Sequence, residues 1–139
     1  MKQHIVNEPS KSNRSYVVQQ MIQFNGLHFP KELRDNYQEV HLMVKDEDGQ
    51  LYGGLIGEIF CNWMQVEFLF VDEKLRGQHY GSQLLEEAEK LAKAKGCDFI
   101  KLDTLSFQAL DFYLKNGFVV YGKLENAGGH THYYLKKDI

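Results

Sequence analysis

Hydrophobic residues recur along this chain with two periods, which predict helices in some segments and strands in others. Spacings of three to four residues predict a helix around Tyr16–Phe24, a long helix from Gly81 to a cap at Gly96, and a short helix over Ser106–Asn116. Segments rich in β-branched and aromatic residues predict six strands. These strands are Val40–Lys45, Leu51–Phe60, Trp63–Val71, Phe99–Thr104, Phe118–Tyr121 and His132–Leu135.

The order of these elements predicts an α/β fold with a mixed sheet. Asp48-Gly49 supplies the tight turn of a hairpin between the first two strands, because glycine tolerates the positive φ that such a turn requires. Farther along, the strand, helix, strand order over residues 63–104 predicts a right-handed crossover between parallel neighbours. No repeat or Pro/Ser-rich linker interrupts the chain, so residues 1–139 are predicted to form a single domain.

Composition narrows the classes of function that this chain can serve. Of its residues 43% are hydrophobic and 25% are charged, which is typical of a folded domain. The net charge of −3, with no basic cluster, disfavours nucleic acid as a partner. No apolar stretch approaches the ~20 residues of a membrane span, and no signal-like segment opens the chain, so a cytoplasmic protein without a membrane partner is expected. Cys61 and Cys97 lack CxxC or histidine companions, so neither a disulfide nor a metal site is expected.

The segment between the third strand and the long helix carries the clearest chemical signal. Gly77 and Gly81 lie in the stretch Asp72–Ser82, where the first N–H groups of the helix have no partner within it. These N–H groups and the positive end of the helix dipole form a site for an anion such as pyrophosphate. A Walker lysine and a full GxGxxG are absent, so neither a P-loop nor a Rossmann site is predicted. The alternative is a strand-to-helix turn that simply needs glycine.

Two motifs in this order resemble those of the GNAT acetyltransferase family. Arg76-Gly77-Gln78-His79-Tyr80-Gly81 is similar to the family's pyrophosphate loop, Q/R-x-x-G-x-G/A, with His79 in place of a glycine. The stretch from Ala109 to Phe118 is similar to the A-x-x-F-Y-x-x-x-G-F signature that follows it. The resemblance implies a mixed, mostly antiparallel sheet with a splayed parallel central strand pair, flanked by helices. At His79 we expect a helical φ, which a side chain tolerates.

The resemblance also implies where acetyl-CoA, the co-substrate of the family, would bind. It places this molecule in a cleft between Trp63–Val71 and Phe99–Thr104, with no metal. The main chain of Leu69, Phe70 and Val71 would pair with the pantetheine arm, and Ser106 stands where the family often has an asparagine that touches the cofactor. The pyrophosphate would be held by Arg76, Gly77, Gln78, His79, Tyr80, Gly81 and Ser82.

Acetyl transfer to an amine requires two proton transfers, and two residues are candidates for them. An alkylammonium, with a pKa of about 10.4, must lose a proton before it attacks, and the leaving thiolate must gain one. Glu67 is the candidate base, because alternation places it on one strand face with Gln65, Leu69 and Val71, toward the cleft. A solvated or ion-paired carboxylate is the alternative, and Gln65 is a competing alignment position. Tyr113 matches the tyrosine that the family places near the cofactor sulfur, and its phenol suits the acid.

The residues and the resemblance together predict an acetyl-CoA-dependent N-acetyltransferase that acts on a small-molecule or peptide amine by direct attack in a ternary complex. An acyl-cysteine route is disfavoured, because Cys61 lies on the order of 26 Å of extended chain before Leu69, and Cys97 opens the next strand. His130 and His132 share a strand face, but two ligands make a weak metal site. The alternative function is a non-catalytic acyl-CoA-binding sensor or interaction module, and a homodimer stays open as an assembly.

The acceptor amine is expected to approach from the opposite side of the splayed strands. The segments that such a fold places there are residues 25–37 and 123–130. Aromatic residues such as Tyr37 and the carboxylate of Glu125 suit a cationic small molecule. Ordinary surface loops are the alternative interpretation of both segments.

Overall fold

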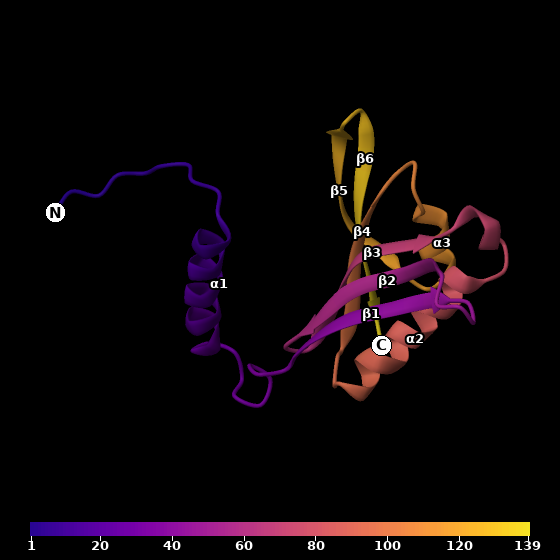
Figure 1. Ribbon diagram of the computed structural model, residues 1–139, viewed down its shortest axis with the longest axis horizontal. Coiled ribbons are helices and arrows are strands. Elements are labelled where there is room, and N and C mark those ends of the chain that lie inside the picture. Colours follow the sequence, from indigo (N-terminus) through magenta and orange to yellow (C-terminus); the bar gives the residue numbers. More distant parts are fainter. The chain divides into compact units, whose positions relative to one another are not determined.

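The computed structural model describes residues 1–139 as two compact parts, Met1–Asp35 and Asn36–Ile139 (Figure 1). The first part contains α1 (Lys11–Gly26), which the sequence predicts from a later start. The helix is capped at Ser10, whose hydroxyl accepts a hydrogen bond from the N–H of Asn13. No helix combines the length and apolar character that a membrane crossing requires.

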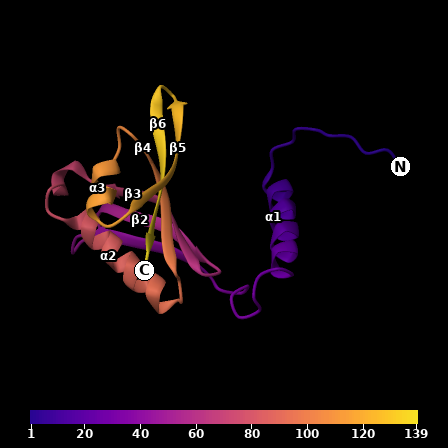
Figure 2. The same ribbon diagram turned by 180° about the vertical axis from the view of Figure 1, so that it is seen from behind.

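The second part is built around a six-stranded sheet in the order β1-β2-β3-β4-β6-β5 (Figures 1 and 2). Only the β3–β4 pair is parallel, which confirms the predicted mixed, mostly antiparallel sheet. The last two strands are longer than predicted, because Gly128 and Gly129 adopt positive φ and close a hairpin between them. The strands are β1 (Tyr37–Lys45), β2 (Leu51–Phe60), β3 (Trp63–Val71), β4 (Phe99–Leu105), β5 (Val119–Ala127) and β6 (His130–Asp138).

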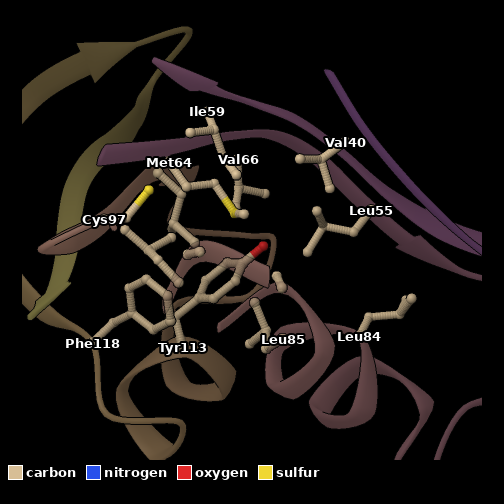
Figure 3. Packing of buried hydrophobic residues seen from close by; sticks show 14 of the residues in the cluster. Val40, Leu55, Ile59, Met64, Val66, Leu84, Leu85, Cys97, Tyr113 and Phe118 are labelled. Carbon is tan, nitrogen blue, oxygen red and sulfur yellow. The ribbon is translucent and has the colours of Figure 1, made fainter. Parts of the chain in front are cut away.

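Two helices and a short 3-10 turn complete this part of the chain. The turn η1 (Glu73–Leu75) leads from β3 into α2 (Tyr80–Ala94), and α3 (Leu110–Lys115) follows β4. The apolar stripe of α2 packs against the sheet and buries Leu84, Leu85, Ala88 and Ala92. Each buried leucine contributes roughly 1.5–3 kcal/mol. Tyr113 of α3 joins the same core as Leu85 (Figure 3), so both helices lie on one face of the sheet.

The helix α3 is shorter than the predicted Ser106–Asn116 because a glutamine side chain holds the preceding residues in a turn. The Gln108 Oε1 atom accepts the N–H of Leu105 at 2.7 Å and the hydroxyl of Thr104 at 3.3 Å. The N–H of Gln108 also donates to the carbonyl of Leu105 at 2.9 Å, and these bonds hold residues 104–108 in a turn. The helix therefore begins only at Leu110.

The parallel pair β3–β4 opens along its length. The two strands are paired only at Trp63↔Phe99, Met64↔Ile100 and Gln65↔Lys101. Beyond Gln65 and Lys101 the backbone edges that face each other have no strand partner. The splayed central pair implied by the family resemblance is therefore present, and α2 is the crossover that joins its two strands.

A β-bulge in β3 corrects one sequence-based expectation. Ile56 pairs with Phe68 and Gly57 pairs with Val66, so Glu67 is an extra residue without a partner in β2. The bulge reverses the alternation, because Leu69 packs against the helix-side core together with Val66, whereas Phe68 is 68% exposed. The prediction that Gln65, Glu67, Leu69 and Val71 share one face is therefore wrong.

Candidate active site

A cavity of about 1100 Å³ lies between the diverging ends of β3 and β4. Its walls come from β3 beyond Gln65, from β4 beyond Lys101, from the loop that leads into α2, and from α3. All of its lining residues belong to the Asn36–Ile139 part. The sequence elements that carry the two motifs thus meet around one space.

One end of the cavity offers backbone donors from the loop before α2. The N–H of Gln83 donates to the carbonyl of His79 at 3.0 Å, and this bond begins the helical series. Among the hydrogen bonds of turns and caps, none uses the N–H groups of Gly77–Ser82 as donors. His79 is the N-cap residue but its side chain makes no capping bond, so these donors stay available. The side chains of Arg76 and Lys115 line the same cavity, and the arrangement suits an anion.

The backbone of His79 differs from the sequence-based expectation. Its φ is 68° and its ψ is 14°, which is the left-handed region and not the helical one. The expectation of a helical φ at this position is therefore wrong. A non-glycine residue pays about 1–2 kcal/mol for this conformation. The loop thus retains the geometry for which a glycine is suited, although the sequence has a histidine.

Gly81 has a packing role in addition to its place in the loop. A Cβ atom at this position would lie 2.9 Å from Cζ of Phe112 in α3. A side chain at Gly81 would therefore require the Phe112 ring to shift, so the present approach of α2 and α3 depends on this glycine. The two motifs of the sequence are therefore in direct contact.

Arg76 and the end of β3 are held together by a side-chain bond. The Arg76 Nε atom donates to the carbonyl of Val71 at 3.0 Å, and its guanidinium lies 6.0 Å from the ring centre of Phe70. Leu69, Phe70 and Val71 line the cavity and pair with β2 on their other edge. Their edge toward β4 is the one left open by the splay.

Two of the predicted cofactor-binding residues do not line the cavity. The Gln78 amide instead donates to the carbonyl of Lys74 at 3.4 Å. The Ser106 hydroxyl accepts the N–H of Thr131 at 3.2 Å, which ties this residue to β6. The geometry therefore gives no support to a contact from either side chain to a molecule in the cavity, because each is turned toward a neighbouring segment.

Tyr113 reaches the cavity from α3. Its ring lies between Phe118 and Leu85, with its oxygen pointing away from α3 (Figure 3). The residue is only 6% exposed, and its hydroxyl makes no hydrogen bond within the protein. Every fully buried polar side-chain atom has a hydrogen-bond partner, so this hydroxyl is not fully buried. It therefore opens onto the cavity that Tyr113 lines. Burial, with a smaller contribution from the charge of Asp103, raises the pKa of Tyr113 to about 12. The phenol is therefore protonated throughout the neutral range.

Glu67 also lines the cavity, from the bulge in β3. Its side chain is exposed and forms no ion pair. Its charge contributes to raising the pKa of Tyr37, after burial of that phenol and the effects of Glu58 and Glu39. Glu67 thus forms no ion pair at the cavity wall, and its exposure agrees equally with a base and with the solvated carboxylate of the alternative interpretation.

The structure adds a pair of residues that sequence reasoning missed. His132 of β6 places Nε2 3.2 Å from Oδ1 of Asp103 in β4, and both residues line the cavity. The sequence contains only weak signals for them: a charged residue within a predicted strand, and a histidine that shares a strand face with His130. Their meeting depends on β6 lying next to β4, which the strand order alone decides.

Other residues considered from the sequence lie away from this cavity. Cys61 and Cys97 are buried free thiols that shortly precede the first residues of β3 and β4, at the ends of these strands away from the cavity. Burial is the main cause of the raised pKa of the Cys97 thiol. None of the residues 123–130 lines the cavity, and Glu125 pairs with Lys123 at 3.7 Å. No group of three His, Cys, Asp or Glu side chains is placed to hold a metal ion.

Comparison with known proteins gives a consistent result. The family model described as Acetyltransferase (GNAT) family matches residues 10–118. The chain is 34% identical over 87 residues to acetyltransferase Atu2258 of Agrobacterium fabrum, a match that spans 63% of this chain and 64% of that relative. It is 35% identical over 95 residues to blasticidin-S acetyltransferase of Streptomyces morookaense, which covers 67% of this chain and 70% of the relative.

A solved structure extends the similarity over the whole length. The crystal structure of an acetyltransferase from Bacillus cereus ATCC 14579 has a TM-score of 0.88 and 39% sequence identity to this chain. The alignment covers 99% of this chain and 98% of that one. The aligned residues therefore include those of the sheet and those of the loop before α2.

Proposed function

The chain belongs to the GNAT acetyltransferase family, and on that premise we propose that it is an acetyl-CoA-dependent N-acetyltransferase that acts on a primary amine. The observation that carries this proposal is a single cavity with unpartnered backbone N–H groups at Gly77–Ser82 and the hydroxyl of Tyr113 on its wall. Acetyl-CoA, when bound, supplies an acetyl group activated as a thioester. Everything else in the reaction is a matter of binding, orientation and proton transfer by this chain.

The anion end of the cavity would bind the pyrophosphate. The N–H groups of Gly77–Ser82 lie at the first turn of α2, where the helix dipole is positive. Arg76 and Lys115 add positive charge from the loop and from α3. Gln78 and His79 contribute through their main chain, because recognition of this kind uses backbone donors and tolerates varied side chains.

The open edge of β3 would hold the pantetheine arm. Leu69, Phe70 and Val71 pair with β2 on one side only, and the missing strand partner on the other side leaves main-chain groups for strand-like pairing. The Val71 carbonyl already accepts Arg76 Nε, which connects this edge to the anion end. The two binding elements are thus held in one geometry.

Two side chains on the cavity wall would move the protons. The Glu67 carboxylate, free of ion pairs, would accept a proton from the acceptor ammonium directly or through a water. The Tyr113 hydroxyl would donate its proton to the sulfur as the carbon–sulfur bond breaks and the carbon–nitrogen bond forms. A raised pKa keeps this phenol protonated until the leaving thiolate needs the proton.

Direct transfer from thioester to amine is the route that the geometry supports. An acyl-cysteine intermediate would need a thiol at the cavity, and Cys61 and Cys97 lie at the far ends of the strands that form its walls. The named activity of the Streptomyces relative, a blasticidin-S acetyltransferase, favours a small-molecule acceptor over a peptide. We therefore propose a small-molecule amine as the acceptor, and we also propose that residues 1–139 form a single domain.

The proposed function is tested by thiol release from acetyl-CoA with a panel of primary amines. We expect amine-dependent release well above the rate of hydrolysis without an amine. Binding of CoA measured by calorimetry in parallel separates the alternatives. A protein that binds CoA but releases no thiol with any amine would be an acyl-CoA-binding sensor, and the enzymatic proposal would then be wrong.

A further inference from the structure

Two carboxylates follow the point at which the parallel strands part, one on each strand. The last parallel pair is Gln65↔Lys101, and Glu67 and Asp103 are each the second residue beyond it on their strands. Both line the cavity, one from each wall. Because the strands diverge from this point, the two acidic side chains lie at the narrow end of the cavity, where β3 and β4 are still close.

The charges of the cavity are therefore divided between its ends. Arg76 and Lys115 belong to the end formed by the α2 loop and α3, since Phe112 of α3 touches the first turn of α2. Glu67 and Asp103 belong to the end where strand pairing stops. An anion is attracted to the first end and a cation to the second. This separation of charge allows an anionic molecule and a cationic molecule to bind at different ends of the same cavity.

Asp103 is held in position by β6. His132 Nε2 lies 3.2 Å from Oδ1 of Asp103, and the hydroxyl of Tyr134 lies 3.4 Å from His132 Nδ1. The Asp103 carboxylate and the Tyr134 hydroxyl thus lie beside different nitrogens of the His132 ring, and a proton on Nε2 places an N–H group next to the carboxylate. The second carboxylate oxygen, Oδ2, has no partner in the protein. With half of the Asp103 side chain exposed, this oxygen is free to contact a ligand.

Aromatic rings accompany the carboxylates on the cavity wall. Phe68, next to Glu67, is 68% exposed, and Phe107 is 63% exposed. Phe107 packs edge-on against His130 with ring centres 4.7 Å apart, two residues before His132 on β6. Large exposed aromatic side chains beside acidic groups attract an organic cation through both charge and the negative faces of the rings.

We propose that Asp103, positioned by His132, binds the acceptor at the acidic end of the cavity and selects acceptors that carry a positively charged ammonium group. The inference rests on the proposed acetyl transfer and names its acceptor class. Both residues line the cavity, and the charge of Asp103 contributes to the raised pKa of Tyr113, the proposed proton donor. Asp103 is a binding residue in this assignment, and His132 is a positioning residue that acts through it.

A cation that cannot be acetylated tests the binding site without turnover. The probe is butyltrimethylammonium, added to the full chain in the presence of CoA and followed by amide chemical shifts in NMR. We expect saturable shifts around residues 102–105 and 132–134 in the wild type. Asp103→Asn should lower the affinity at least tenfold, because the substitution removes the charge and retains the shape. The matched control Asp111→Asn, which removes a carboxylate of α3 outside the cavity, should bind as the wild type does.

The positioning role of His132 is tested by two substitutions. His132→Gln keeps an N–H that can reach Asp103, so it should stay within about threefold of the wild-type affinity, whereas His132→Ala should lose affinity several-fold. With an amine substrate, Asp103→Asn should raise the KM for the amine at least tenfold and leave the KM for acetyl-CoA within twofold. Equal losses in His132→Gln and His132→Ala would remove His132 from the assignment.

The outcomes separate this inference from the proposed function. If the cation binds and Asp103→Asn abolishes binding while no amine is acetylated, the acidic site stands and the enzymatic function fails. If amines are acetylated and Asp103→Asn leaves the KM for the amine unchanged, the function stands and the inference is wrong. A wild type that shows no saturable shifts at these residues also overturns the inference.

Discussion

The pKa of the Tyr113 phenol is set by the surroundings of the side chain as well as by the phenol itself. The hydroxyl is confined to a cavity wall near Asp103, and both desolvation and that charge disfavour the phenolate. The result is an acid that keeps its proton at neutral pH. Tyr113→Phe preserves the ring packing of the core and removes only the hydroxyl group.

Tyr113→Phe should lower turnover on the order of a hundredfold, because the thiolate then leaves without a proton donor. The affinity for CoA should stay close to that of the wild type. Steady-state kinetics and calorimetry on the same preparation measure both. Equal loss of turnover and of CoA affinity would indicate that the hydroxyl binds the cofactor and that the proton comes from elsewhere.

The raised pKa of Tyr113 also makes a prediction about stability in alkali. The folded-state pKa of about 12 lies above the ordinary value of 10.0, so the stabilisation is complete below pH 10 and is lost as the pH rises toward 12. The loss amounts to roughly 2–3 kcal/mol. Urea unfolding at pH 10 and pH 12 should show a smaller decrease for Tyr113→Phe than for the wild type. Equal decreases would mean that the phenol ionises in both states alike.

His79 adopts a left-handed backbone conformation that is unfavourable for a residue with a side chain. Its left-handed φ costs about 1–2 kcal/mol, whereas the greater freedom of an unfolded glycine costs roughly 0.5–1 kcal/mol. His79→Gly should therefore leave stability unchanged or raise it by about 1 kcal/mol, and CoA affinity should stay within tenfold. Thermal unfolding and calorimetry measure the two. Gln78→Gly, which replaces a neighbour without positive φ, should destabilise instead and serves as the control.

A change in CoA affinity of more than tenfold in His79→Gly would contradict this account. The imidazole would then contact the cofactor or obstruct it, in addition to forming part of the loop. The stability measurement distinguishes the two cases, because removal of backbone strain stabilises the protein with or without a ligand.

At the scale of elements, the contact between α2 and α3 makes the two sequence motifs into one site. Gly81 allows Phe112 to approach the first turn of α2, so the phosphate loop and the helix that carries Tyr113 are packed directly together. The bulge at Glu67 has a comparable effect in β3. It turns Leu69 toward the core and leaves Glu67 on the cavity wall.

Gly81→Ala should destabilise the protein by about 1–3 kcal/mol and weaken CoA binding, because the new methyl group would displace Phe112. The double variant Gly81→Ala/Phe112→Leu should recover part of both, since leucine leaves more room. Urea unfolding and calorimetry measure these effects. If Ser82→Ala, which adds no bulk in the same turn, weakens binding as much as Gly81→Ala does, the packing explanation is wrong.

At the scale of the whole molecule, a ligand in the cavity should stabilise the fold, because the cavity is lined by β3, β4, α2 and α3 together. A ligand that binds only the folded state adds about 2.7 kcal/mol at a concentration of 100 times its Kd. For a chain of this size that corresponds to an increase in Tm on the order of 5–10 °C. CoA should give such an increase in a thermal scan. Pantetheine, which lacks the pyrophosphate, should give much less, and equal shifts would exclude the loop before α2 as the anion site.

The sequence by itself determined the features that depend on residues close together along the chain. The periodicity of Leu84, Leu85 and Ala88 predicts α2, the Asp48-Gly49 turn predicts the first hairpin, and the glycines of the loop predict its free N–H groups. Both family motifs are local stretches of this kind. The fold class therefore follows from the amino-acid sequence alone, and so does the position of the loop before α2, although Lys115 and the left-handed φ of His79 do not.

Only the tertiary structure decided the features that depend on how distant segments pair. The extra residue at Glu67 is defined by the register of β3 against β2, and alternation within β3 alone gives the opposite face for Leu69. The pair of Asp103 and His132 exists because β6 lies beside β4, 29 residues later in the chain. A local pattern sets the direction of side chains along one strand, whereas a contact between strands is set by the packing of the whole sheet.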